Sequence, residues 1–135
     1  MSIRELFLVA SGGAVGSATR YAVSGIAQRL WGASNGFVAS FPTGTLVVNV
    51  TGSLLIGLVA GLAESRALLS ADVRLLLVTG VLGGYTTFSA FSLETLLLLR
   101  AGQTTTALTG VALQVLLGVA AAFAGFALGL AGRPA

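Results

Sequence analysis

Residues 73–99, VRLLLVTGVLGGYTTFSAFSLETLLLL, decide the fold of this chain. As one continuous α-helix the stretch would be about 40 Å long, whereas the hydrocarbon core of a bilayer is about 30 Å thick. Two glycines followed by hydroxyl residues, Gly83–Thr87, lie in the middle. Such residues are typical of helix breaks, so we predict a broken membrane-spanning helix, with a simple kink as the alternative. A break frees backbone carbonyls that protein, water or a bound cation has to satisfy.

The composition around this stretch is that of a membrane protein. Of 135 residues, 56% are hydrophobic and 8% are charged, against roughly 25% charged residues in an average soluble domain. The seven arginines and four acidic residues give a net charge of +3 and form no basic stripe, which excludes a nucleic-acid partner. There is no cysteine and no histidine. The usual thiolate and imidazole chemistry is therefore absent, and we do not expect an enzyme.

Three more apolar segments accompany the broken one. The four predicted membrane helices cover residues 6–30, 43–63, 73–99 and 105–130. They predict an all-α integral membrane protein with a single transmembrane domain, residues 1–135. A β-barrel would need alternating strands, and continuous runs such as Leu96–Leu99 do not alternate. We interpret the first segment as a helix rather than a cleaved signal peptide, because Gly12-Gly13, Arg20 and Tyr21 interrupt it.

The chain contains 19 glycines, and several of them recur at a spacing of four. Small residues at this spacing allow two membrane helices to approach closely. The pattern therefore predicts a tightly packed bundle, without indicating its function. The pairs are Gly12 and Gly16, Gly57 and Gly61, Gly80 and Gly84, and Gly125 and Gly129.

The arginines that flank the segments give only a weak orientation signal. One side of the membrane would hold Arg4, Arg66, Arg74 and Arg133, and the other Arg29 and Arg100. Because arginine-rich loops favour the cytoplasmic side, a bias this weak permits insertion in both orientations. An antiparallel pair of identical chains is thus one possibility, and a single fixed orientation is the other.

A few polar residues fall inside the apolar segments, where they are costly and often functional. Arg20 either reaches the interface or a helix end, or it provides a positive charge that attracts anions. Thr45, Asn49 and Ser53 form one polar stripe at a spacing of four. Asn49 can donate two hydrogen bonds without carrying a charge. Asn49 and Gln114 either join helices or line a path for an ion.

Aromatic and hydroxyl side chains follow the predicted break. Phe88 and Phe91 are three residues apart and share a helix face. Such pairs usually pack together, but the positive edge of an aromatic ring can also face an anion. Ser89 adds a hydroxyl donor, and Glu94 lies further along the same segment, close to a mouth of the bundle.

At these residues the chain resembles the Fluc (CrcB-like) family of fluoride channels. The likeness is carried by residues 12–16 (GGAVG, running to Arg20-Tyr21), 41–52 (FPTGTLVVNVTG) and 83–92 (GGYTTFSAFS). It implies a passive, highly selective channel that exports fluoride from the cytoplasm of a bacterium. The protein would lie in the plasma or inner membrane as an antiparallel, dual-topology homodimer, although some members pair non-identical chains. No phosphate-binding GxxxxGK[ST] motif is present, which agrees with passive transport.

The resemblance also implies roles for individual residues. The fluoride pathway would be lined by Asn49, Phe88, Ser89 and Phe91. The carbonyls of Gly83 and Thr86 from both chains would hold a structural Na⁺ at the centre of the dimer. Arg20 and Glu94 would lie towards the aqueous entrances.

The sequence departs from the family pattern at two places. Ala90 stands where relatives commonly carry threonine, and the fourth segment offers Gly110, Gln114 and Gly118 instead of hydroxyl or tyrosine side chains. We include Gln114 in the predicted pathway on its position alone. Two further hypotheses remain: a small dual-topology, proton-coupled multidrug exporter, for which Glu94 would be the titrating carboxylate, and a subunit that only packs within a larger complex.

Overall fold

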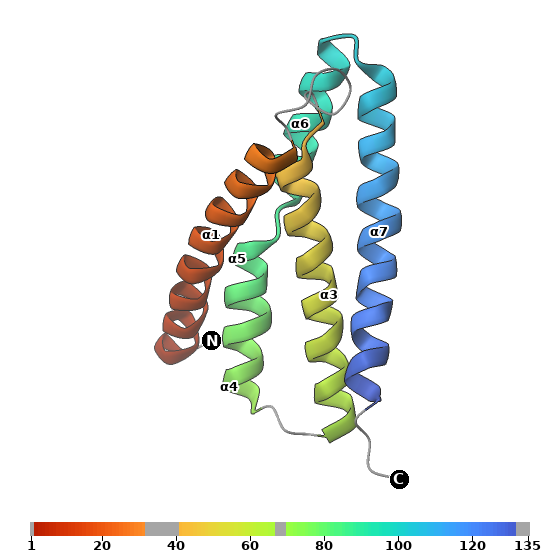
Figure 1. Cartoon of the computed structure of the whole chain (residues 1–135). Coiled ribbons are helices and arrows are strands. Elements are labelled where there is room, and N and C mark those ends of the chain that lie inside the picture. Colours follow the sequence, from red (N-terminus) through yellow and green to blue (C-terminus); the bar gives the residue numbers. More distant parts are fainter. Residues whose placement is uncertain (1, 32–40, 67–69, 132–135) are drawn as a thin grey trace.

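The computed structural model describes residues 2–31, 41–66 and 70–131, and over this part of the chain it is all-helical, with no strand (Figure 1). This confirms the all-helical class that the sequence predicts. The long helices are α1 (Ile3–Trp31), α3 (Thr43–Arg66) and α7 (Thr104–Leu130). Between α3 and α7 the predicted broken segment consists of α4 (Ala71–Arg74), the π-helix η1 (Leu75–Leu82), α5 (Gly83–Tyr85) and α6 (Phe88–Arg100).

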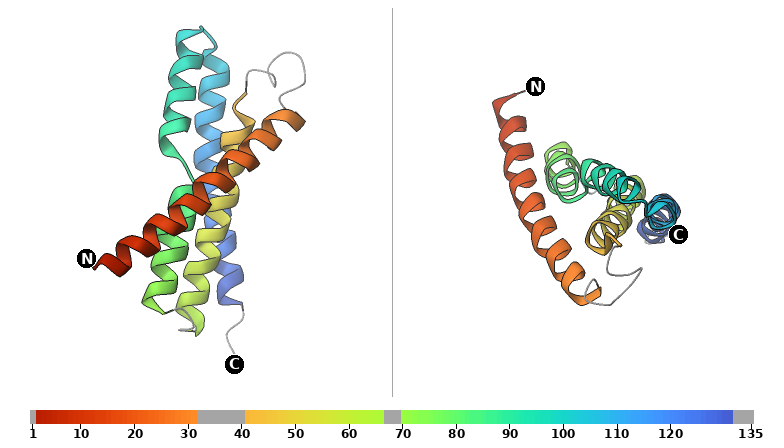
Figure 2. Two further views of the ribbon diagram at one scale, coloured as in Figure 1. Left: turned by 90° about the vertical axis from the view of Figure 1, so that its left-hand side faces the viewer. Right: turned by 90° about the horizontal axis from the view of Figure 1, so that it is seen from above.

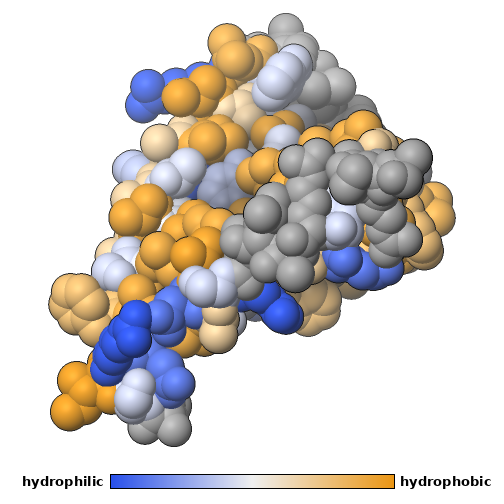
Figure 3. All heavy atoms as spheres, turned by 90° about the horizontal axis from the view of Figure 1, so that it is seen from below, coloured by the Kyte–Doolittle hydropathy of each residue, from blue (hydrophilic) through white to orange (hydrophobic). Residues whose placement is uncertain are grey.

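Three parts of the chain are helical, long and apolar enough to cross a membrane: Thr43–Ser65, Ala71–Arg100 and Thr104–Leu130. The helix α1 has 29 residues, which is also enough to cross a membrane, but glycine, serine and arginine residues make its sequence less apolar. From the end at which α1 and α4 begin, hydrophobic side chains occupy much of the visible surface (Figure 3). An exposed apolar surface of this kind fits a lipid environment.

The helices form two closely packed pairs. α3 and α7 run side by side along their length, while α1 crosses the bundle obliquely and packs on η1 and α5 (Figure 2). The broken segment belongs to both pairs, because its first half packs on α1 and its second half, α6, packs on α7. The break therefore lies where the two pairs meet.

The break lies at the threonines rather than at the glycines. The helix ends at Tyr85 and resumes at Phe88, with extended backbone at Thr86 (φ −78°, ψ 156°) and Thr87 (φ −149°, ψ 111°). Both extended residues lie within the predicted range, Gly83–Thr87, whereas Gly83 and Gly84 of that range stay helical. Gly84 serves packing instead, because a Cβ on it would lie 2.6 Å from the carbonyl oxygen of Gly13.

The four glycine pairs lie at the two tight helix contacts, as the spacing predicts. Gly12 and Gly16 of α1 lie against Gly80, Val81 and Tyr85, so that side chains there would overlap backbone atoms. The second contact joins Gly57 and Gly61 of α3 to the α7 backbone, and Gly125 and Gly129 of α7 to the α3 backbone. Close backbone approach at these points stabilises both pairs through dispersion and weak hydrogen bonds.

Replacing Gly129 with alanine is expected to destabilise the protein by about 1–3 kcal/mol, because the added methyl group would overpack a backbone contact. Its Cβ would lie 2.7 Å from both Leu58 O and Leu62 N. Gly25→Ala is the matched control, since nothing lies within 4 Å of a Cβ at Gly25 and alanine is the better helix former. Thermal unfolding in detergent measures both. Equal midpoints for the two variants would contradict the packing role.

The arginines of the described residues lie at the two ends of the bundle, apart from Arg20. Arg4 in the first turn of α1 pairs with Asp72 of α4. Arg29 and Arg100 lie in the last turns of α1 and α6, at the opposite end (Figure 1). Arg133 lies outside the described residues.

Candidate functional site

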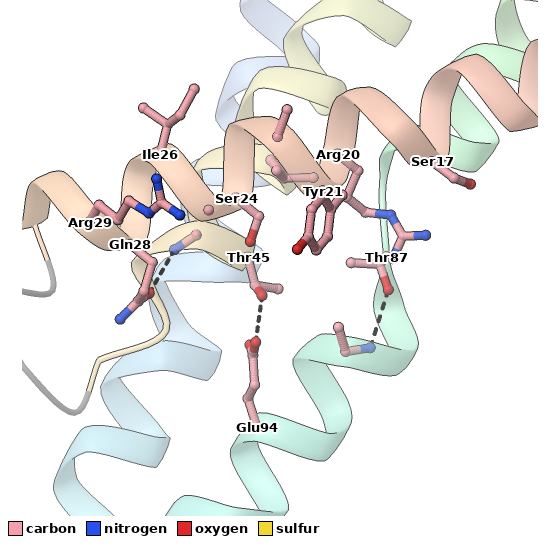
Figure 4. A pocket seen from close by; sticks show the side chains of 15 residues that line it. Ser17, Arg20, Tyr21, Ser24, Ile26, Gln28, Arg29, Thr45, Thr87 and Glu94 are labelled. Atoms are coloured by element: carbon pink, nitrogen blue, oxygen red, sulfur yellow. Dashed lines mark hydrogen bonds between the residues drawn. The ribbon is translucent and has the colours of Figure 1, made fainter.

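A cavity of about 840 Å³ leads from one end of the bundle to the break in the third segment (Figure 4). The second half of α1, the start of α3 and the first turns of α6 form its walls. Two arginines, Arg20 and Arg29, line it together with neutral polar side chains and one carboxylate, Glu94. At its base lie Thr87 and Ala90, at the N-terminal end of α6. The cavity thus joins the positive end of a helix to the surface of the bundle.

Asn49 holds the break from the α3 side. Its Oδ1 atom accepts a hydrogen bond from the Thr87 backbone N–H at 2.8 Å, and its Nδ2 atom donates to the Thr87 carbonyl at 3.1 Å. A second proton on Nδ2 is donated to Gln114 Oε1 at 3.2 Å. The amide thereby replaces helix partners of an extended residue at membrane depth, where unpaired groups are costly. Asn49 therefore joins α3 both to the break and to Gln114 of α7.

Arg20 holds the other side of the break. Its Nε atom donates to the Gly84 carbonyl at 3.1 Å, and the Ser17 hydroxyl donates to the same oxygen at 3.4 Å. In a continuous helix this carbonyl would accept from the N–H of Phe88. A positive side chain at the carbonyl end of a helix is favourable. Arg20 thus reaches a helix end, one of its two predicted roles, while also lining the cavity.

Glu94 lies on the wall of the cavity, opposite the start of α3. Its Oε1 atom accepts a hydrogen bond from the Thr45 hydroxyl at 2.7 Å (Figure 4). Its Oε2 atom is buried and has no hydrogen-bond partner among the described residues. Thr45, the first member of the polar stripe, therefore points at Glu94, the only carboxylate among the described residues that line this cavity.

Phe88 and Phe91 form an edge-to-face pair directly after the break. Their ring centroids are 5.5 Å apart and their planes are inclined by 61°. Phe88 is 79% exposed, whereas Phe91 is partly buried and faces a small second cavity of about 10 Å³. Ser89 is exposed, with its hydroxyl 3.3 Å from that of Thr87. The two rings therefore extend from the interior of the chain to an open face.

Gln114 of α7 lies next to Phe91 at the small cavity. Its Oε1 atom accepts from Asn49, whereas its Nε2 atom is buried without a partner among the described residues. Gly110 and Phe41 line the same cavity, and a Cβ on Gly110 would lie 3.8 Å from the Phe41 ring. The Gln114 amide thus has a buried N–H donor that is not used by the described residues, beside an aromatic ring.

At the break, backbone carbonyls also lose the N–H donors that they would have in a continuous helix. The Thr87 N–H donates to Asn49 rather than to Gly83 O, its partner in a continuous helix. Gly83 is exposed, and its carbonyl has lost that donor. Among the described residues there is no acidic, histidine or cysteine cluster that could hold a metal. Carbonyls of an unwound helix are the groups that coordinate Na⁺ in membrane proteins.

The structure brings most of the predicted site residues to one region. Arg20, Asn49, Gly83, Thr86 and Phe88 lie within or next to the break. Glu94 is further along the cavity wall. Three features were missed: the Thr45–Glu94 hydrogen bond, the position of Arg29 in the cavity and the capping role of Gln28, whose Oε1 atom accepts from Thr43 and Gly44 at the start of α3. The stripe spacing was a signal for Thr45, and none of comparable strength existed for Gln28.

Comparison with known proteins gives a consistent result. The family model described as CrcB-like protein, Camphor Resistance (CrcB), matches residues 7–126. A protein of Rhizobium meliloti named fluoride-specific ion channel FluC is 48% identical over 126 residues, covering 93% of this chain and 96% of the relative. Proteins of the same name from Agrobacterium fabrum and Methylobacillus flagellatus are 47% and 43% identical, covering 93% and 92% of this chain and 95% and 93% of the relatives.

The match extends over all four helical segments and includes every residue of the break. At more than 40% identity over nearly full length, the relationship concerns the whole chain rather than one motif. The chain belongs to the CrcB-like family of bacterial multi-pass membrane proteins.

Proposed function

We propose that this protein is a passive, highly selective fluoride channel that lets fluoride leave the bacterial cytoplasm. The observation that carries the proposal is the break in the third segment: Thr87 at the break lines a cavity that Arg20 and Arg29 also line, and the Phe88–Phe91 pair follows the break directly. Relatives covering more than 90% of the chain are named fluoride-specific ion channels. The family and the geometry support the same activity.

The chemistry of the site suits a small, strongly hydrated anion. Arg20 and Arg29 raise the local anion concentration in the cavity. Beyond the cavity, amide and hydroxyl donors can replace the water around the ion without the deep electrostatic trap that a fully buried cation would form. Conduction requires binding that is favourable enough for entry and weak enough for exit. Fluoride that enters as HF and dissociates inside would leave through such a path, assisted by the inside-negative potential.

We place the pathway along Phe88, Phe91, Ser89, Asn49 and Gln114. The ring edges of the two phenylalanines would face the ion, because an aromatic edge carries positive partial charge. Gln114 suits this role because its Nε2 atom is buried without a partner. Asn49 would donate when the ion displaces one of its present acceptors. Arg20 and Glu94 would act at the cavity, before the narrow part of the path.

The pathway is completed, in this proposal, by an antiparallel second copy of the chain. On the open face the third segment exposes polar or small residues at membrane depth, including Thr79, Gly83 and Ser89. Lipid would leave these groups without partners, whereas a second chain could cover them. The weak arginine bias supports opposite orientations of the two copies. A paralogous partner chain could occupy the same place.

The carbonyls of Gly83 and Thr86 would hold a structural Na⁺ between the two copies. The fit is supported by Gly83, which is exposed and whose carbonyl has lost its helical donor to Asn49. Two carbonyls from each chain would supply four uncharged oxygen ligands. When bound, the ion would neutralise carbonyl dipoles that meet at the centre of the dimer.

Fluoride release from liposomes that contain the purified protein tests this function. Release should be rapid, should need only a counter-ion pathway, and should continue when the pH is equal on both sides. A proton-coupled exporter, the alternative based on Glu94, would instead require a proton gradient. Inert liposomes together with co-purification of another membrane protein would favour the packing-subunit hypothesis.

A further inference from the structure

The broken conformation has to be stabilised against a continuous helix. A continuous helix would pair the carbonyls of residues 83–86 with the N–H groups of residues 87–90. In the structure the N–H groups of Thr87 and Ala90 bond instead to the side chains of Asn49 and Thr87. A side chain of α3 and the capping side chain of α6 therefore offset lost helical hydrogen bonds, and each such contact shifts the balance towards the break.

One of these contacts lies immediately before the break. Tyr85 is the last helical residue of α5 and is only 8% exposed. Its hydroxyl lies 2.9 Å from that of Thr51 in α3. The Thr51 hydroxyl proton is directed to its own helix, to Val47 O at 2.7 Å and Val48 O at 3.2 Å. Tyr85 is consequently the donor and Thr51 the acceptor.

The same turn of α3 fits closely around the break. A Cβ on Gly52 would overlap the Thr86 methyl group and would lie 3.2 Å from the Tyr85 ring. Asn49, one turn earlier, holds Thr87. Residues 49–52 of α3 thus contact three consecutive residues at the break, Tyr85, Thr86 and Thr87.

We propose that Tyr85 and Thr51 are positioning residues that hold the half-helix before the break, as Asn49 holds the residue after it. Their hydrogen bond fixes α5 against α3, and with it the place of the Gly83 and Thr86 carbonyls relative to Phe88. Without it, α5 can rotate or re-form helix through residues 86 and 87. The inference rests on the proposed channel function for its effect on flux, but not for its effect on stability.

Tyr85→Phe removes only the donor, and Thr51→Val removes the acceptor, together with its bond to its own helix, at nearly constant volume. Interhelical hydrogen bonds in membranes contribute about 0.6 kcal/mol on average, and at most about 1.7. Each variant should therefore reduce fluoride flux by about 3-fold to 20-fold. The double variant should be no worse than either single variant, because both remove the same bond. Thr51→Ser keeps the acceptor and should retain flux close to that of the unmodified protein.

Thr19→Val is the control, because Thr19 is exposed and, like Thr51, bonds to its own helix, at Val15 O. It should leave flux unchanged. Additive losses in the double variant, or loss of flux in Thr51→Ser equal to that in Thr51→Val, would overturn the proposal. Thermal unfolding of the same variants in detergent gives a second double-mutant cycle, in which the losses of stability should also be non-additive. If the unmodified protein conducted no fluoride, the proposed function would fail, and the unfolding cycle would still test the Tyr85–Thr51 pair.

Discussion

Replacing Asn49 with aspartate is expected to reduce fluoride flux by about 100-fold or more. The amide now accepts from Thr87 N and donates to Thr87 O and Gln114 Oε1. A carboxylate could keep the first bond, but it would face the two oxygens without a proton to donate. It would also repel an anion in the path. Breaking a buried polar arrangement in this way costs about 3–5 kcal/mol, which corresponds to a factor of more than 100.

The measurement is fluoride release from liposomes that contain equal amounts of each variant. Gln103→Glu is a matched control, since it makes the same amide-to-carboxylate change at an exposed residue before α7. Asn49→Ser, which retains an uncharged donor, should lie between the unmodified protein and Asn49→Asp. Fluoride release by Asn49→Asp at the unmodified rate would show that conduction needs neither the hydrogen bonds of Asn49 to Thr87 nor Asn49 as a lining residue of the pathway.

Replacing Phe91 with isoleucine is expected to lower fluoride flux by about 10-fold or more. Isoleucine preserves an apolar side chain of similar reach but has no ring edge of positive partial charge. The change also removes the edge-to-face contact with Phe88, whose centroid lies 5.5 Å away. Phe88→Ile should reduce flux in the same direction, because the two rings are proposed to act in sequence.

Phe123→Ile is the matched control for the aromatic substitutions. Phe123 lies in α7, is 73% exposed and is not part of either cavity. Its replacement should leave flux unchanged in the same assay. Normal flux in both Phe88→Ile and Phe91→Ile would remove the rings from the pathway and would leave the neutral donors as its lining.

The helices and their close contacts could be predicted because they depend on local composition and spacing. The glycine pairs at a spacing of four indicate where backbones approach, and the structure places them at the α1–η1–α5 and α3–α7 contacts. The break lies within the predicted range, Gly83–Thr87, at its two threonines. Gly84 looked like a helix breaker in isolation, whereas in the bundle it is the surface on which Gly13 packs. Its role is set by a helix far away in the sequence.

The same limit applies to the site. The polar stripe of α3 could be identified from its period, but its partners lie 38 to 65 residues away in the sequence. The hydroxyl contact between Tyr85 and Thr51 requires the helix pairing to be known first. The π-helical form of η1 was not predicted either, since nothing in the apolar run LLLVTGVL distinguishes it from an α-helix. The residue type indicates which contacts a side chain can make, and the tertiary packing decides which of them it does make.

The most direct test of the channel is a comparison of fluoride and chloride release from the same liposomes, at equal pH and with a potassium ionophore present. If neutral donors and ring edges at the break form the pathway, fluoride should leave rapidly while chloride is retained, because the larger anion cannot be enclosed by so close a set of donors. Equal release of the two ions, or release of neither, would contradict a selective fluoride pathway through the broken helix.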